Sequence, residues 1–196
     1  MNRDSLLPKG CKVLELGAGL GLCGFVAGGL LSKAAEDSAA EELSHVCISD
    51  YSRVLVKNLE RNVTANNALV TIPMSVRKLD WYDYKEGKAP PQNSYDIESF
   101  DLIIGSALIY SPDHAVCADV ILHFLQQGRK GAVAIVCQIL DRCGFKDSFL
   151  VRCKTLGLSV DIEPVSEETV FLAEQSIGKK LMGGGDAFGI CKIRLQ

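Results

Sequence analysis

Three glycines that follow a short apolar segment near the N-terminus could hold a nucleotide-like ligand. In V-L-E-L-G-A-G-L-G, residues 13–21, they would let the backbone turn tightly and approach a ligand where any Cβ would clash. Glu15 stands just before them, and its carboxylate can accept hydrogen bonds from a cationic or hydroxylated ligand. The pyrophosphate of NAD would instead favour a helix N-terminus without an added carboxylate. The combination favours S-adenosylmethionine over NAD.

Acidic or aromatic residues also end the next apolar segments along the chain. Asp50 closes the second segment, where it could accept hydrogen bonds from the hydroxyls of a ribose. Asp80 and Trp81 close the third, and supply an acceptor for an exocyclic amine beside a ring that can stack on a purine. The fourth ends at Ser106, with Tyr110 shortly after it. Because open parallel sheets bind ligands beyond the carboxyl ends of their strands, we expect these residues to converge on one site.

Each of these residues also has a purely structural explanation. Asp50, considered alone, could equally cap the helix that follows it, and Trp81, the single tryptophan, could cover the edge of the sheet. A lone glycine motif is weak, but acidic or aromatic residues at successive strand ends are difficult to attribute to packing. His45, His114 and His123 are scattered along the chain, which favours solvated or capping roles over catalysis.

The elements that must position these residues alternate between strand and helix. Apolar runs predict seven strands, at residues 12–16, 45–50, 75–80, 100–106, 131–137, 158–163 and 188–195. The clearest helix is 52–66, with an apolar residue at every fourth position. A second helix begins at Ser111, has Pro112 in its first turn and ends before Gly128. This alternation predicts a mostly parallel sheet with helices on both faces.

Some segments interrupt the alternation. Residues 32–44 are rich in Ala, Ser and Glu, and would extend the first helix or form a solvated loop. Residues 85–98 contain two prolines and a glycine and should be an irregular surface connection. The glycine run at 183–185 marks a turn before the last strand.

The composition is that of one globular domain, which we expect to span residues 1–196. With 47% hydrophobic residues, the chain can bury one substantial core. A formal charge of −3 argues against a nucleic-acid partner, and the apolar runs are too short to span a bilayer. The eight cysteines form no C-x-x-C pair and there is no signal-peptide pattern. We therefore expect reduced thiols, no metal site and a location in the cytoplasm or nucleus, whereas oligomeric state stays open.

Several segments together carry a family resemblance: L-E-L-G-A-G-L-G-L at 14–22, S-D-Y at 49–51, K-N-L-E-R-N-V at 57–63, L-D-W at 79–81 and F-D-L-I-I-G-S-A-L-I-Y at 100–110. With them the chain resembles the class I, seven-β-strand S-adenosylmethionine-dependent methyltransferases over nearly its whole length. More narrowly, it is similar to the protein-lysine methyltransferases of the methyltransferase-like family 16 group. The resemblance implies an α/β, Rossmann-like doubly wound sheet whose last strand is antiparallel and inserted. It also implies S-adenosyl-L-methionine as cofactor and a protein lysine as acceptor.

The resemblance further implies a cofactor site made by Glu15, Gly17, Ala18, Gly19, Asp50, Tyr51, Asp80, Trp81 and Ser106. In it the glycine turn would line the methionyl and ribose parts, and Asp50 would hold the ribose hydroxyls. Asp80 would meet the adenine amine, Trp81 would pack on adenine, and Ser106 would lie beside the methionine moiety. Tyr110 would border the acceptor channel.

The chain departs from the family after the fourth strand, where relatives carry D-x-x-Y. Here Ala107 replaces the acid and Tyr110 is kept. About a dozen residues precede the first strand, fewer than in relatives, so we expect an N-terminal extension to be lacking. A catalytically degenerate binding or scaffold protein and a small-molecule methyltransferase therefore stay open as alternatives. An NAD-dependent dehydrogenase is disfavoured, because Leu22 stands where the last glycine of G-x-G-x-x-G would be.

Overall fold

The computed structural model describes residues 7, 10–36, 44–87, 99–178 and 187–196. The glycine run at 183–185 and parts of the segments 32–44 and 85–98 lie outside the described residues. The described part of 32–44 extends the first helix as far as residue 36, and residues 85–87 belong to a 3₁₀ helix.

A seven-stranded sheet with the order β3-β2-β1-β4-β5-β7-β6 forms the centre of the structure. Its strands are β1 (Lys12–Leu16), β2 (His45–Asp50), β3 (Met74–Lys78), β4 (Leu102–Ser106), β5 (Val133–Ile139), β6 (Leu158–Pro164) and β7 (Phe188–Leu195). The strands β1 to β5 pair in parallel, whereas β7 is antiparallel to both neighbours, β5 and β6. The predicted inserted, antiparallel last strand is therefore confirmed. The strand order reverses between β1 and β4, where such sheets bind ligands.

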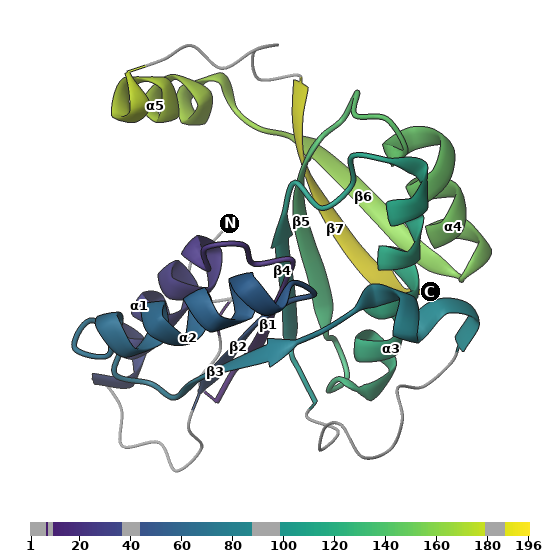
Figure 1. Cartoon of the computed structure of the whole chain (residues 1–196). Helices are drawn as coiled ribbons and strands as arrows, with labels where there is room; N and C mark the ends of the chain where they lie inside the picture. Colours follow the sequence, from purple (N-terminus) through teal and green to yellow (C-terminus); the bar gives the residue numbers. More distant parts are fainter. Residues whose placement is uncertain (1–6, 8–9, 37–43, 88–98, 179–186) are drawn as a thin grey trace.

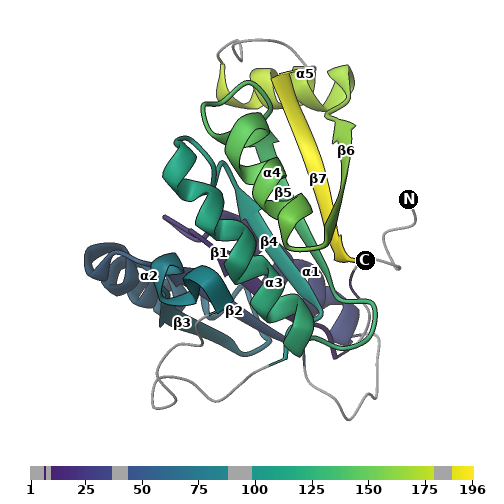
Figure 2. The same ribbon diagram turned by 90° about the vertical axis from the view of Figure 1, so that its right-hand side faces the viewer.

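Helices cover both faces of this sheet (Figures 1 and 2). One face carries α1 (Leu22–Glu36) and α2 (Arg53–Asn66), and the other carries α3 (Cys117–Gln127) and α4 (Leu150–Thr155). Short helical turns follow the strand ends: η2 (Trp81–Gly87), η3 (Pro112–Val116) and η4 (Phe145–Phe149). The last helix, α5 (Glu167–Ile177), joins β6 to β7 and lies apart from the other helices in Figure 1.

Several predicted boundaries differ from the structure by one or two residues, and two of the differences have local reasons. The third strand ends at Lys78 rather than at Asp80, because the Asp80 carboxylate accepts a hydrogen bond from the backbone N–H of Tyr82 and starts η2. The helix predicted from Ser111 begins as the 3₁₀ turn η3 and becomes α-helical only at Cys117. The Ser111 side chain makes no capping hydrogen bond.

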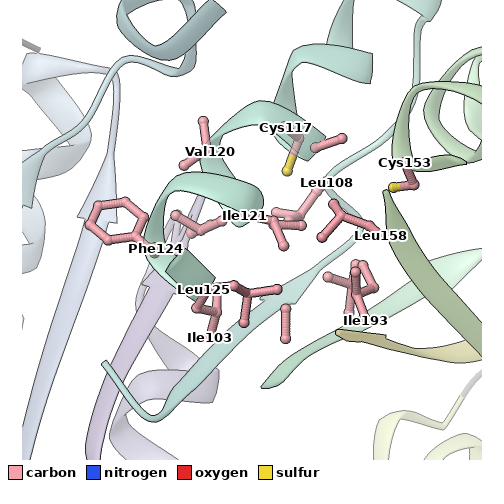
Figure 3. Packing of buried hydrophobic residues seen from close by; sticks show 14 of the residues in the cluster. Ile103, Leu108, Cys117, Val120, Ile121, Phe124, Leu125, Cys153, Leu158 and Ile193 are labelled. Carbon is pink, nitrogen blue, oxygen red and sulfur yellow. The ribbon is translucent and has the colours of Figure 1, made fainter. Parts of the chain in front are cut away.

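The core forms two layers because side chains alternate across the strands. On β1, Leu14 and Leu16 face the larger layer beneath α3, part of which appears in Figure 3, and Val13 faces the layer beneath α1. This alternation places Glu15 on the same side as Val13, toward α1.

All eight cysteines are free, as predicted, and most are buried: burial raises the pKa of Cys153 to about 12, so that its thiol stays protonated. No helix among the described residues has the length and apolar character needed to cross a membrane.

Candidate functional site

A cavity of about 540 Å³ opens at the carboxyl ends of the central strands. Its volume lies within the usual range of small-molecule sites, about 300–1,000 Å³. The residues that line it are Gly17, Asp50, Tyr51, Leu55, Asp80, Trp81, Tyr82, Ala107, Leu108, Tyr110 and His114. Most of the residues predicted for the cofactor site, together with Tyr110, are therefore brought together from four strand ends. Ala18, Gly19, Glu15 and Ser106 do not line the cavity.

The glycine turn forms one wall of the cavity and requires glycine for conformational reasons. Gly17 and Gly19 both have φ +57°, in the left-handed region that side chains disfavour. A Cβ on Gly17 would lie 3.0 Å from Leu108 and 3.4 Å from the Trp81 ring, so it would enter the space between them. Ala18 stabilises the turn, because its backbone N–H donates a hydrogen bond to the carbonyl oxygen of Ser49 at 2.8 Å.

Asp50 links the glycine turn to the start of α2. One carboxylate oxygen accepts a hydrogen bond from the N–H of Gly19 at 3.1 Å, and the other from the N–H of Ser52 at 3.0 Å. The side chain is buried yet lines the cavity. Each carboxylate oxygen has a further lone pair, so the same group can cap the helix and accept from a ligand hydroxyl. The two explanations of Asp50 are compatible.

Glu15, predicted as a ligand contact, does not line the cavity. Its side chain is 3% exposed, and its carboxylate accepts a hydrogen bond from the N–H of Gly24, in the first turn of α1, at 2.9 Å. The cause is strand alternation, which turns residue 15 toward α1 rather than toward the cavity. Burial raises the pKa of Glu15 from 4.5 to about 7, and the hydrogen bond from Gly24 partly offsets this effect.

The raised pKa predicts that Glu15 makes folding stability depend on pH. Below pH 4.5 the carboxyl is protonated in both states; as the pH rises to 7 the unfolded chain loses its proton first, so the free energy of unfolding falls. We expect the free energy of unfolding of Glu15→Gln not to show this fall. Relative to wild type, the free energy of unfolding of the variant should therefore rise by up to about 3 kcal/mol between pH 4.5 and 8. Urea unfolding across this range measures it. Glu60→Gln, at an exposed site on α2, should follow wild type; a pH-independent difference for Glu15→Gln would contradict the assignment.

The chain turns sharply after β4, and this turn decides which side chains face the cavity. Ala107 adopts a left-handed φ of +53°, and is the one described non-glycine residue with a positive φ. As a result Ala107, Leu108 and Tyr110 line the cavity, whereas Ser106, predicted beside the methionine moiety, does not line it. Buried Gln138 on β5 fastens the turn: its side-chain oxygen accepts from the Ile109 N–H at 3.1 Å, and its side-chain N–H donates to the Ile109 carbonyl oxygen at 2.6 Å.

The conformation of Ala107 predicts a stabilising substitution. A left-handed conformation costs alanine about 1 kcal/mol that glycine does not incur. We therefore expect Ala107→Gly to raise the free energy of unfolding by about 1 kcal/mol, measured by urea unfolding. Ala115→Gly, in the neighbouring 3₁₀ turn η3 without a positive φ, should instead lower it by about 0.5–1 kcal/mol. Equal losses in the two variants would contradict the expectation.

Sequence reasoning missed His114, for which a solvated or capping role was expected. Its ring lies perpendicular to that of Tyr110, with 4.1 Å between the centroids, and perpendicular to that of Trp81 at 6.0 Å. The side chain lines the cavity. The four-residue spacing from Tyr110 is a signal that could have indicated one side of a helical turn. His45 and His123 do not line the cavity, and the described residues form no cluster of three or more potential metal ligands.

Comparison with known proteins identifies a family to which the chain belongs and a set of solved structures with a similar fold. A family model described as lysine methyltransferase matches residues 4–154. No curated protein sequence is similar enough to the chain to count as a relative.

Similar solved structures are enzymes of several kinds. A TehB-like SAM-dependent methyltransferase from Corynebacterium glutamicum is 17% identical with a TM-score of 0.57, over 98% of this chain and 84% of that one. A SAM-dependent methyltransferase from Aquifex aeolicus is 15% identical with a TM-score of 0.56, over 96% and 85%. A putative rRNA methylase from Clostridium thermocellum is 12% identical with a TM-score of 0.60, over 97% and 91%. At these identities the likeness concerns the fold.

Proposed function

Since the chain belongs to the lysine methyltransferase family, we propose that it transfers the methyl group of S-adenosylmethionine to a lysine side chain of a protein. That it is an S-adenosylmethionine-dependent methyltransferase follows from the family. The observation that carries the proposal of a lysine acceptor is the cavity at the strand ends. One part of its lining, with Asp50, Asp80 and Trp81, suits a nucleoside, and its opening is lined by exposed tyrosines. We propose residues 1–196 as one methyltransferase domain.

The residues present fit the cofactor. Gly17 leaves room beside Trp81 that any Cβ would occupy, and buried Asp50 offers free lone pairs to ribose hydroxyls. Asp80 and Trp81 stand together for the adenine, as an acceptor and a stacking surface. When bound, the cofactor supplies an electrophilic methyl group on a sulfonium. The protein's part is to align that methyl group with the acceptor nitrogen and to exclude water.

The mouth of the cavity supports a protein side chain as acceptor. Tyr51, Tyr82 and Tyr110 are exposed while they line the cavity, so a long side chain could enter between aromatic rings. A second hollow of about 310 Å³ adjoins the cavity and shares Tyr82 with it. Such an extension suits the chain that flanks an acceptor lysine better than it suits a small metabolite.

Two measurements test the proposal. Calorimetric titration with S-adenosylhomocysteine should give binding in the micromolar range; no heat from a folded sample would contradict the cofactor site. Incubation of lysate proteins with the enzyme and S-adenosylmethionine carrying a heavy methyl group should then give labelled lysines, detected by mass spectrometry. Asp50→Ala serves as the inactive control. Label confined to small molecules or to other residue types would contradict the lysine acceptor.

Ala107 is the specific observation that favours a second candidate, a degenerate methyltransferase fold that binds without turnover. Alanine cannot orient an amine as the family's acid would. This candidate predicts that S-adenosylhomocysteine binds, that wild type labels no protein, and that Ala107→Asp gains activity. The left-handed backbone at residue 107 is one that aspartate tolerates better than alanine does, so the substitution should fold.

A further inference from the structure

A lysine acceptor must lose a proton before it can be methylated. The ammonium form has no lone pair, so a group at the cavity must accept the proton. The family's acid after the fourth strand is replaced by Ala107, which cannot do so. The proposed function assigns both described carboxylates that line the cavity to the cofactor: Asp50 to the ribose hydroxyls and Asp80 to the adenine amine.

The hydrogen bonding of His114 leaves one nitrogen available. Its Nδ1 lies 3.1 Å from the carbonyl oxygen of Leu108. A carbonyl oxygen can only accept a hydrogen bond, so Nδ1 carries the hydrogen and, in the neutral ring, Nε2 carries a lone pair. No hydrogen bond to Nε2 occurs within the described part of the chain, and His114 lines the cavity together with Ala107 and Tyr110.

Two aromatic rings pack around His114 at the cavity. The rings of Tyr110 and Trp81 stand perpendicular to the imidazole, with their centroids 4.1 and 6.0 Å from its centroid. The described charged residues on η3 and on the elements packed against it are Asp113 on η3 itself, Asp83 and Lys85 on η2, Lys146 and Asp147 on η4, Arg152 and Lys154 on α4, and Asp119 on α3. These residues are four acids and four bases, so neither sign of charge dominates around η3.

We propose that Nε2 of His114 is the base that takes the proton from the acceptor lysine, an inference that rests on the proposed function. An N–H bond of the ammonium breaks, its electron pair stays on the nitrogen, and His114 becomes an imidazolium. The neutral amine then forms the new N–C bond while the bond from the methyl carbon to sulfur breaks. The electron pair of that bond goes to sulfur, which leaves S-adenosylhomocysteine and a methylated ammonium.

The single tryptophan allows the proton on His114 to be observed without cofactor or acceptor. A protonated imidazole quenches a neighbouring indole, and Trp81 is the only indole in the chain. In the cofactor-free protein, the fluorescence of Trp81 should fall as the pH is lowered from 8.5 to 5. The fall should disappear in His114→Ala and persist in the matched control His45→Ala, at the opposite end of the strands. His114→Asn, whose amide can still donate to Leu108, provides a second variant if the alanine variant does not fold.

Methyl transfer then tests the base itself. We expect His114→Ala to lower kcat at pH 7 by about 100-fold or more, with a rate that rises in proportion to hydroxide and is partly restored by added imidazole. Its affinity for S-adenosylhomocysteine should change far less than kcat. Wild type that binds this ligand but labels no lysine contradicts the proposed function. An active wild type with a His114→Ala variant of equal kcat and pH profile, or a Trp81 titration unchanged in that variant, overturns the role of His114.

Discussion

Replacing Gly24 by alanine is expected to lower the free energy of unfolding by about 2–3 kcal/mol, by overpacking. Gly24 lies in the first turns of α1, where the helix presses directly on the sheet. A Cβ there would collide with Ile48 of β2 and lie 2.6 Å from the carboxylate of Glu15. Neither neighbour can move freely, because Ile48 is fully buried and Glu15 is held by its hydrogen bond to the Gly24 N–H. Urea unfolding at pH 7 measures the loss.

The same helix contains the matched control. Around Gly29 no atom lies within 4 Å of the position that a Cβ would take. Gly29→Ala should therefore raise the free energy of unfolding by about 0.5–1 kcal/mol, through helix propensity alone. If the two substitutions change stability by the same amount and in the same direction, the close contact of α1 with β2 and Glu15 is wrong.

The second large effect is expected for cofactor affinity. Asp50→Ala should weaken the binding of S-adenosylhomocysteine by about 100-fold, which corresponds to about 2.7 kcal/mol and lies within the range for hydrogen bonds to a charged group. The substitution removes the acceptor for the ribose hydroxyls and also frees the Gly19 N–H, so that the glycine turn is less well held. Isothermal titration calorimetry measures the dissociation constant.

Asp83→Ala is the control for this prediction. Asp83 is an exposed carboxylate on η2, close in sequence to the adenine side of the cavity, and it does not line the cavity. The affinity of the Asp83→Ala variant for S-adenosylhomocysteine should stay within about threefold of wild type, since a distant exposed charge is screened by water. Circular dichroism and urea unfolding should show that Asp50→Ala is folded. A folded Asp50→Ala protein with wild-type affinity would place the ribose elsewhere.

Local sequence patterns were sufficient to locate all seven strands, four of them with shifted bounds, and to predict much of the cavity lining. The bounds of β1, β2 and β7 are those that the apolar runs predict, because each run ends in a glycine, an acid or a loop. The convergence of Asp50, Asp80 and Trp81 follows from one rule, that the carboxyl ends of parallel strands meet at one edge. These properties depend on neighbours in the sequence and on the regular geometry of the sheet.

The tertiary structure alone decided where the polar side chains point and which distant groups they meet. The sequence position of Glu15 predicts a ligand contact, yet the pleat of β1 turns its side chain beneath α1, where it accepts a hydrogen bond from Gly24, nine positions later. The turn at Ala107 brings Leu108 and Tyr110 to the cavity wall, and Gln138, which is remote in sequence and stands in an otherwise apolar strand, holds this turn by hydrogen bonds to Ile109. The position of His114 likewise depends on tertiary packing, because its ring contacts Tyr110 in the turn after β4 and Trp81 on η2. The composition and spacing of the chain determined its sheet and its kind of ligand; side-chain direction and long-range hydrogen bonds, which no local pattern encodes, determined the groups available for chemistry.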